Sequence, residues 1–155
     1  MDLASWTVGL SLIVLTIAIH TTGVVMMAFG LQARIRVRVD EHMDDPRRLI
    51  PIAIGHIGAV ALILAALHGL ESVLWASAFR WLGALGSFTD ASVYSLATMT
   101  TLDMPELAVA SRYRMISALE AVNGVLLFGI STAFIFAVMQ AYWLMLSRRH
   151  QTDLG

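Results

Sequence analysis

The sequence predicts an all-α membrane protein with three transmembrane helices and one short, re-entrant pore helix. Of the 155 residues, 58% are hydrophobic and only 14% are charged, which is too apolar for a soluble globular domain. Three apolar stretches exceed the roughly 20 residues that a helix needs to cross a bilayer. A fourth apolar stretch, between the second and third, is too short to cross.

The three long stretches lie at about residues 6–31, 49–79 and 115–146. The first has no basic leader and no small-x-small cleavage site after it, so we expect a transmembrane helix and not a cleaved signal. The chain has no Cys, which excludes disulfides and thiolate metal sites.

The distribution of arginine predicts the orientation of the helices. The polar stretch 32–48 carries five of the ten basic residues, and Arg148 and Arg149 follow the third apolar stretch. Because cytoplasmic loops are enriched in basic residues, we expect an external N-terminus and a cytoplasmic C-terminus. Residues 32–48 then form a cytoplasmic loop, either solvated or in contact with anionic lipid.

The short apolar stretch, residues 91–101, reads ASVYSLATMTT. Ser87 and Asp90 supply a helix start signal before it, and Pro105 cannot continue a helix after it. Irregular backbone at membrane depth is tolerated only where it is buried in protein or lines a water-filled cavity. The pattern predicts a pore loop; the alternative is an ordinary external loop with exposed acids.

A single pore loop cannot enclose a channel, so several copies must surround one axis. Each short helix would then direct the negative end of its dipole toward the centre of the membrane. Asp103 and Glu106, which follow this helix, would form rings of carboxylates, and such rings select cations.

Residues 90–143 resemble the pore module of small bacterial two-transmembrane-type potassium channel relatives. The resemblance lies in Tyr-Ser-Leu at 94–96 and Thr-Met-Thr-Thr at 98–101, and in Leu-Glu-Ala-Val-Asn-Gly at 119–124. The second stretch, with His-Gly-Leu-Glu at 68–71 and Trp75, is similar to the outer helix of the same group. The resemblance implies a homotetramer in the bacterial inner membrane.

The filter is where the chain departs from that family. The family has Val-Gly-Tyr-Gly-Asp where this chain has Leu-Asp-Met-Pro-Glu at 102–106. Both glycines that allow the left-handed backbone of a potassium filter are missing, so potassium selectivity is not expected. The expected filter residues are Thr100, Thr101, Leu102, Asp103, Met104, Pro105 and Glu106.

Thr-Leu-Asp at 101–103 is similar to the start of the filter in bacterial voltage-gated sodium and calcium channels. Fourfold repetition of Asp103 and Glu106 would gather hard oxygen ligands, which suit Ca²⁺. We therefore expect a calcium-permeable or non-selective pathway in which Ca²⁺, Na⁺ or K⁺ permeates. No cofactor is expected, and no metal beyond the permeating cations.

Polar residues inside the apolar stretches must face protein or water because a charge in the bilayer is costly. We expect four of them to support the pore helix by hydrogen bonding, with direct ion binding as the alternative. These four are His68, Glu71, Glu120 and Asn123.

His20 and His56 come out at similar depth, counting 1.5 Å per residue along their helices. We expect an interhelical hydrogen bond between them. The alternative is a haem or transition-metal site, which would make the chain a membrane electron carrier.

Ser131, Ile135 and Met139 recur every fourth residue on the third long stretch. They would line the inner pore or its gate, or else face a neighbouring helix.

The predicted organisation has three parts: a first helix and loop (1–48), a pore module (49–147) and a cytoplasmic tail (148–155). No catalytic or nucleotide motif is present, so we expect neither an enzyme nor a nucleic-acid binder. The expected partners are identical chains, lipid and permeating cations. A channel-like subunit that does not conduct is a further alternative.

Overall fold

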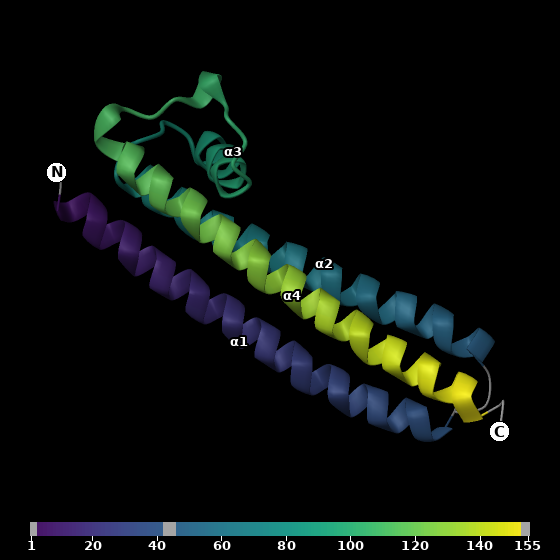
Figure 1. Ribbon diagram of the computed structural model, residues 1–155. Helices are drawn as coiled ribbons and strands as arrows, with labels where there is room; N and C mark the ends of the chain where they lie inside the picture. The colour runs from purple at the N-terminus through teal and green to yellow at the C-terminus, as the bar shows by residue number, and fades with distance from the viewer. Residues whose placement is uncertain (1–2, 42–45, 153–155) are drawn as a thin grey trace. The chain divides into compact units, whose positions relative to one another are not determined.

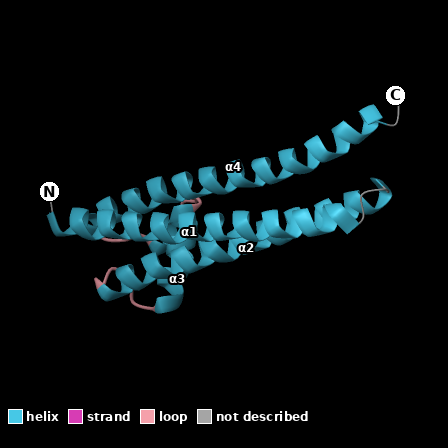
Figure 2. Cartoon of the chain, turned by 90° about the horizontal axis from the view of Figure 1, so that it is seen from below, coloured by secondary structure: helices cyan, strands magenta, loops and turns pink. Residues whose placement is uncertain are grey.

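The computed structural model describes residues 3–41 and 46–152, and side chains within 5–32 and 50–144. This described part contains helices and loops and no strand (Figures 1 and 2). The helices are α1 (Leu3–Glu41), α2 (Pro46–Trp81), α3 (Phe88–Met99) and α4 (Arg114–Thr152), with two 3-10 turns, η1 (Pro105–Leu107) and η2 (Ser111–Tyr113).

Three helices are long and apolar enough to cross a membrane, over Ser5–Gln32, Ile50–Trp81 and Ser111–Leu144. The predicted all-helical membrane protein with three spans is confirmed at this level. One boundary differs from the prediction. The stretch 32–48, expected to be a loop, is helical up to Glu41 and again from Pro46. Residues 42–45 and the arginine side chains of this stretch lie outside the described part.

The chain divides into two compact units, each built from parts of the long helices. The first contains Met1–Thr22 and Ala66–Gly129, and the second contains Gly23–Ala65 and Ile130–Gly155. The second unit has a small core of Ala53, Val138 and Tyr142, against which Leu31, Ile57 and Phe134 pack. The first unit holds α3 and all of the expected filter.

In the first unit, α3 begins as the sequence predicts. The side chain of Ser87 accepts a hydrogen bond from the backbone N–H of Asp90, at 3.0 Å, and Asp90 lies in the first turn. This cap satisfies one of the amides that a helix start leaves free. The prediction of a capped short helix is therefore confirmed.

One face of α3 packs against α2 and α4 (Figure 1). Ala91, Ser95 and Met99, spaced at one helical turn, are buried. The ring of Tyr94 meets that of Phe79 edge to face at 5.2 Å. Around them lies a core of fully or nearly fully buried residues from the surrounding segments, Trp75, Ala76, Phe79, Ala91, Val109, Tyr113 and Ile116.

The last turn of α3 sits against Gly124 of α4. A side chain at this position would meet the backbone of Met99, with a Cβ only 2.8 Å from the Met99 Cα. Backbone cannot move aside as a flexible side chain can. The absence of a side chain at Gly124 therefore allows α3 and α4 to approach this closely.

The helices α2 and α3 end in the same hydrogen-bonding motif but with different residues. After α2, Ala84 N–H bonds to Phe79 O at 2.9 Å and Gly83 takes the left-handed conformation, with φ of 69°. After α3, Leu102 N–H bonds to Ala97 O at 2.8 Å and Thr101 N–H to Thr98 O at 3.0 Å.

This second helix end is strained. The left-handed position belongs to Thr101, with φ of 58°. Glycine is the usual residue there, and a left-handed conformation costs a residue with a side chain roughly 1–2 kcal/mol, a β-branched one most of all. The chain thus turns back against the last turn of α3 at the expense of strain at Thr101.

Replacing Gly124 by alanine should lower the unfolding free energy by about 1–3 kcal/mol, the usual cost of overpacking. The measurement is SDS titration of the purified protein in mixed micelles, followed by circular dichroism. Gly129→Ala is the matched control, because nothing lies within 4 Å of a Cβ at Gly129. It should stabilise by about 0.4–1 kcal/mol. Equal effects of the two variants would contradict the close contact between α3 and α4.

Thr101→Gly should raise the unfolding free energy by about 1 kcal/mol, because glycine adopts the left-handed conformation without steric cost. Thr100→Gly serves as control. Thr100 has φ of −89°, and its hydroxyl donates to Leu96 O at 2.9 Å, so glycine there should destabilise. A destabilising Thr101→Gly would show that the threonine side chain contributes more than the strain costs.

Candidate functional site

The segment that follows α3 carries the expected filter residues, and it is largely exposed within one chain. Thr100, Thr101, Leu102 and Asp103 are exposed, and Met104 is half-buried. Pro105 begins η1 immediately afterwards. Only Leu102, Asp103 and Met104 therefore separate the turn at the end of α3 from η1.

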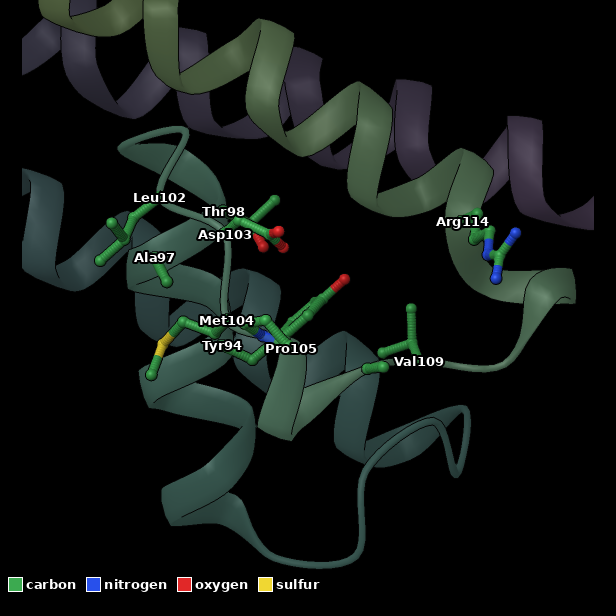
Figure 3. Close-up of a pocket in the computed structure, with 10 residues that line it drawn as sticks. Tyr94, Ala97, Thr98, Leu102, Asp103, Met104, Pro105, Val109 and Arg114 are labelled. Atoms are coloured by element: carbon green, nitrogen blue, oxygen red, sulfur yellow. The ribbon is translucent and has the colours of Figure 1, made fainter.

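A cavity of about 220 Å³ lies beside this segment (Figure 3). Its wall combines the last turns of α3 with the segment after it and the start of α4. The lining residues are Tyr94, Ala97, Thr98, Leu102, Asp103, Met104, Pro105, Ala108, Val109 and Arg114.

The cavity carries opposite charges. Asp103 contributes a carboxylate next to the C-terminal end of α3, and Arg114 contributes a guanidinium from the first residue of α4. Figure 3 shows the two side chains well apart, Asp103 near Thr98 and Arg114 at the start of α4. Glu106 lies on η1, is exposed and is not among the lining residues. The two acids that the sequence groups together thus occupy different surroundings within one chain.

The backbone of the segment differs from that of a potassium filter. Among the described residues other than glycine, only Thr101 has a positive φ. Met104 has a negative φ of −128°, with ψ of 86°. A potassium filter needs repeated left-handed residues so that successive carbonyls face the ion. The absence of potassium selectivity stays a prediction.

Ser95 holds α3 to both of its neighbours. Its hydroxyl donates to Ser72 O of α2 at 2.9 Å, and it also bonds to a carboxyl oxygen of Glu120 on α4. Ser72 adds a hydroxyl contact to Ser95 at 3.3 Å. Tyr94 donates to the Ser117 hydroxyl at 2.8 Å. Glu120 therefore contacts the short helix, as the sequence predicts.

The sequence predicts that Glu71 and Asn123 also support α3. In the structure they bond to α1 instead. Asn123 Nδ2 donates to the Thr16 hydroxyl at 2.8 Å. Glu71 Oε1 lies 2.8 Å from His20 Nδ1, and Glu71 Oε2 lies 3.3 Å from His68 Nδ1. The physical reason is that all sides of these helices are apolar, so the sequence pattern does not fix which face meets which neighbour.

His20 and His56 have separate partners in the structure. His20 bonds to Glu71, whereas His56 Nδ1 bonds to the hydroxyl of Tyr142 in the second unit. Each ring also lies near an aromatic or imidazole ring, His20 at 5.0 Å from His68 and His56 at 6.0 Å from Tyr142. The sequence predicts a hydrogen bond between the two histidines, whereas the structure gives each a bond to a different residue.

The proposed inner stripe on α4 is not uniform within one chain. Ser131 is buried, Ile135 is half-buried and Met139 is exposed. Such a gradient agrees with a stripe that passes from a helix contact to an open face.

The sequence reading missed several residues of the site. The sequence suggested no contact for Ser72 or Arg114. Tyr94 and Ser95 entered only through the Tyr-Ser-Leu match at 94–96, although Ser95 connects three helices. A signal for Ser95 existed: it is the polar residue on the same face of the short helix as Ala91 and Met99. Small polar residues commonly lie at helix interfaces in membranes.

Comparison with known proteins adds no family assignment: no protein-family model, curated protein or solved structure matches the chain. The function is therefore argued from the geometry of the site.

Proposed function

We propose that the chain is one subunit of a homotetrameric cation channel whose selectivity comes from a ring of Asp103 carboxylates, with Glu106 as an outer ring. In this proposal α3 is a re-entrant pore helix on the external side of the membrane. The permeating ions are Ca²⁺ and other cations passing with part of their hydration.

The observation that carries the proposal is the short helix α3 and its acidic end between two membrane-length helices. The helix has 12 residues, which is too few to cross a bilayer. Its inner face is fixed by Ser95 and Met99, and the chain turns back at Thr101 to present Asp103. Such a segment has no role in spanning, but it suits a pore.

The outer face of α3 supports assembly around an axis. Val93 and Leu96 are 43% and 50% exposed in the single chain, and Leu102, in the segment after α3, is 64% exposed. On α4, Val122 and Val125 are each 57% exposed. In a tetramer, identical neighbours would cover apolar residues of this kind.

The electrostatics favour a cation at the end of α3. The C-terminus of a helix carries roughly half a negative charge, and Asp103 adds a full charge to the same region. Repeated about an axis, these charges repel one another unless a cation lies between them. A divalent ion with retained water suits a carboxylate ring better than a ring of backbone carbonyls.

A channel-like subunit that does not conduct is the second candidate. It is favoured by Pro105, which starts η1 directly after Met104, and by Arg114, whose positive charge lines the same cavity as Asp103. Both features would hinder a cation that enters from this side. Ion flux distinguishes the two candidates.

Asp103→Asn should lower Ca²⁺ permeation relative to Na⁺ by about tenfold or more. At an effective dielectric constant of about 20, one carboxylate and one positive unit charge about 10 Å apart attract each other by about 1.7 kcal/mol. Loss of that attraction already corresponds to more than about tenfold in ion occupancy. The measurement is flux of Ca²⁺, Na⁺ and K⁺ into liposomes containing the full chain. Glu106→Gln should have a smaller effect because Glu106 lies outside the cavity.

Asp90→Asn is the matched control for this experiment, since Asp90 is an exposed acid at the opposite end of α3. It should leave selectivity unchanged. Conduction selective for K⁺, or permeation unaltered by both filter variants, would refute the carboxylate ring. Wild-type protein that folds and assembles but passes no ion would favour the non-conducting subunit.

A cysteine in place of Leu102 should link neighbouring chains, because residues beside the axis of a tetramer come close together. The chain has no Cys, so the introduced thiol is the only one. Treatment of vesicles with a short bifunctional maleimide should give covalent dimers on a denaturing gel. Leu62→Cys on α2, 74% exposed, is the control and should remain monomeric. Dimers from Leu62→Cys but not from Leu102→Cys would contradict the proposed axis.

A further inference from the structure

A buried cluster of two imidazoles and one carboxylate joins α1 to α2 in the first unit. It consists of His20 on α1 and of His68 and Glu71 on α2. The side chains of His20 and Glu71 have no exposed surface, and that of His68 has 8%. One potential ligand atom of each residue lies within 4.8 Å of the other two.

We propose that His20, His68 and Glu71 bind a transition-metal dication such as Zn²⁺ or Co²⁺. The site fastens α1 to α2, and it stands apart from ion conduction. From the sequence alone we expect no resident metal. The alternative hypothesis there is a haem or metal site formed by His20 and His56. The structure points to a different set of ligands.

The spacing of the ligand atoms suits a metal. With bonds of about 2.0–2.1 Å, two ligands in a tetrahedral zinc site lie roughly 3.3–3.4 Å apart. Here His20 Nδ1 lies 2.8 Å from Glu71 Oε1, and His68 Nδ1 lies 3.3 Å from Glu71 Oε2. Small rotations of the side chains would open the shorter distance. Two histidines and one glutamate are also a known zinc ligand set.

One carboxylate oxygen has capacity left for a metal. Glu71 Oε2 has no hydrogen-bond partner among the described residues, although His68 Nδ1 is 3.3 Å away. The two atoms are close but are not aligned for a hydrogen bond. A carboxylate oxygen has two lone pairs, so Glu71 Oε2 could bind a metal while it remains close to His68.

The ring of Phe128 holds that of His68 in place. The two rings stack, with centroids 4.1 Å apart and planes inclined by 20°. The ring of His20 lies 5.0 Å from that of His68. Ligands whose orientation is fixed by their neighbours bind metals more tightly. Glu71 also neutralises half of the charge of a dication, which lowers the cost of burying it.

The test uses Co²⁺, whose visible absorption reports its ligands. The full chain is purified in detergent with His42→Ala and His150→Ala, which removes two of the five histidines as adventitious ligands. This protein, in which His20, His68 and Glu71 are unchanged, should bind one Co²⁺ per chain with tetrahedral-type absorption. Zn²⁺ should displace the Co²⁺. Glu71→Gln should weaken binding by more than about 100-fold, since changing even a residue that only hydrogen-bonds to a metal ligand costs about 10–100-fold.

A cysteine variant keeps the test decisive if Glu71→Gln does not fold. In His20→Cys, a thiolate would replace one imidazole, and Co²⁺ should then show sulfur-to-cobalt charge-transfer absorption. The chain has no other Cys, so the band can come only from position 20. His56→Cys, in the second unit, is the control and should show no such band.

Two results would overturn the proposal. One is the failure of wild-type protein to retain Co²⁺ or Zn²⁺ through gel filtration. The other is equal retention by wild type and Glu71→Gln together with no charge-transfer band in His20→Cys. Either result would leave the cluster as a hydrogen-bonded link between α1 and α2. Neither result would bear on the proposed channel, which ion flux tests separately.

Discussion

The position of α3 depends on the hydroxyl of Ser95, which bonds to Ser72 of α2 and to Glu120 of α4. Lipid tails are as apolar as the helices, so the hydrophobic effect does not drive helices together in a membrane. Polar contacts and close packing have to do so. A helix of 12 residues is also too short to be stable alone. The position of the loop with Asp103 therefore depends on the Ser95 hydrogen bonds and on the close approach of α3 to α4 at Gly124.

The same helix that holds α3 also holds α1. Glu120 and Asn123 lie one turn apart on α4, yet Glu120 bonds to Ser95 on α3 and Asn123 to Thr16 on α1. His20 and Glu71 add a second link between α1 and the rest of the first unit. The first helix is thus fastened by polar contacts to the helices that carry α3.

Local features of this structure could be predicted from the sequence, and long-range partners could not. The spans follow from composition, and the start of α3 follows from Ser87 and Asp90, which act within one turn. The partners of Glu71 could not be predicted, because His20 lies 51 residues away and the helices are apolar on all sides. The left-handed Thr101 was also unforeseen. Glycine is the usual residue at a left-handed helix end, so a threonine in the sequence gives no signal for this conformation. The contacts around the end of α3 impose it.

The strain at Thr101 is best understood together with the charge that follows it. Leu102 N–H bonds back to Ala97 O, so the chain reverses at the end of α3, and Asp103 follows closely on the negative end of the helix dipole. Both are negative, and their proximity is unfavourable unless a positive charge is near. Strained conformations persist only where the surrounding structure determines them, and they occur preferentially at functional sites. Within one chain, Arg114 on the cavity wall offers one positive charge. A permeating cation on the axis of an assembly would offer a second, and competition between the two would set how readily the site accepts an ion.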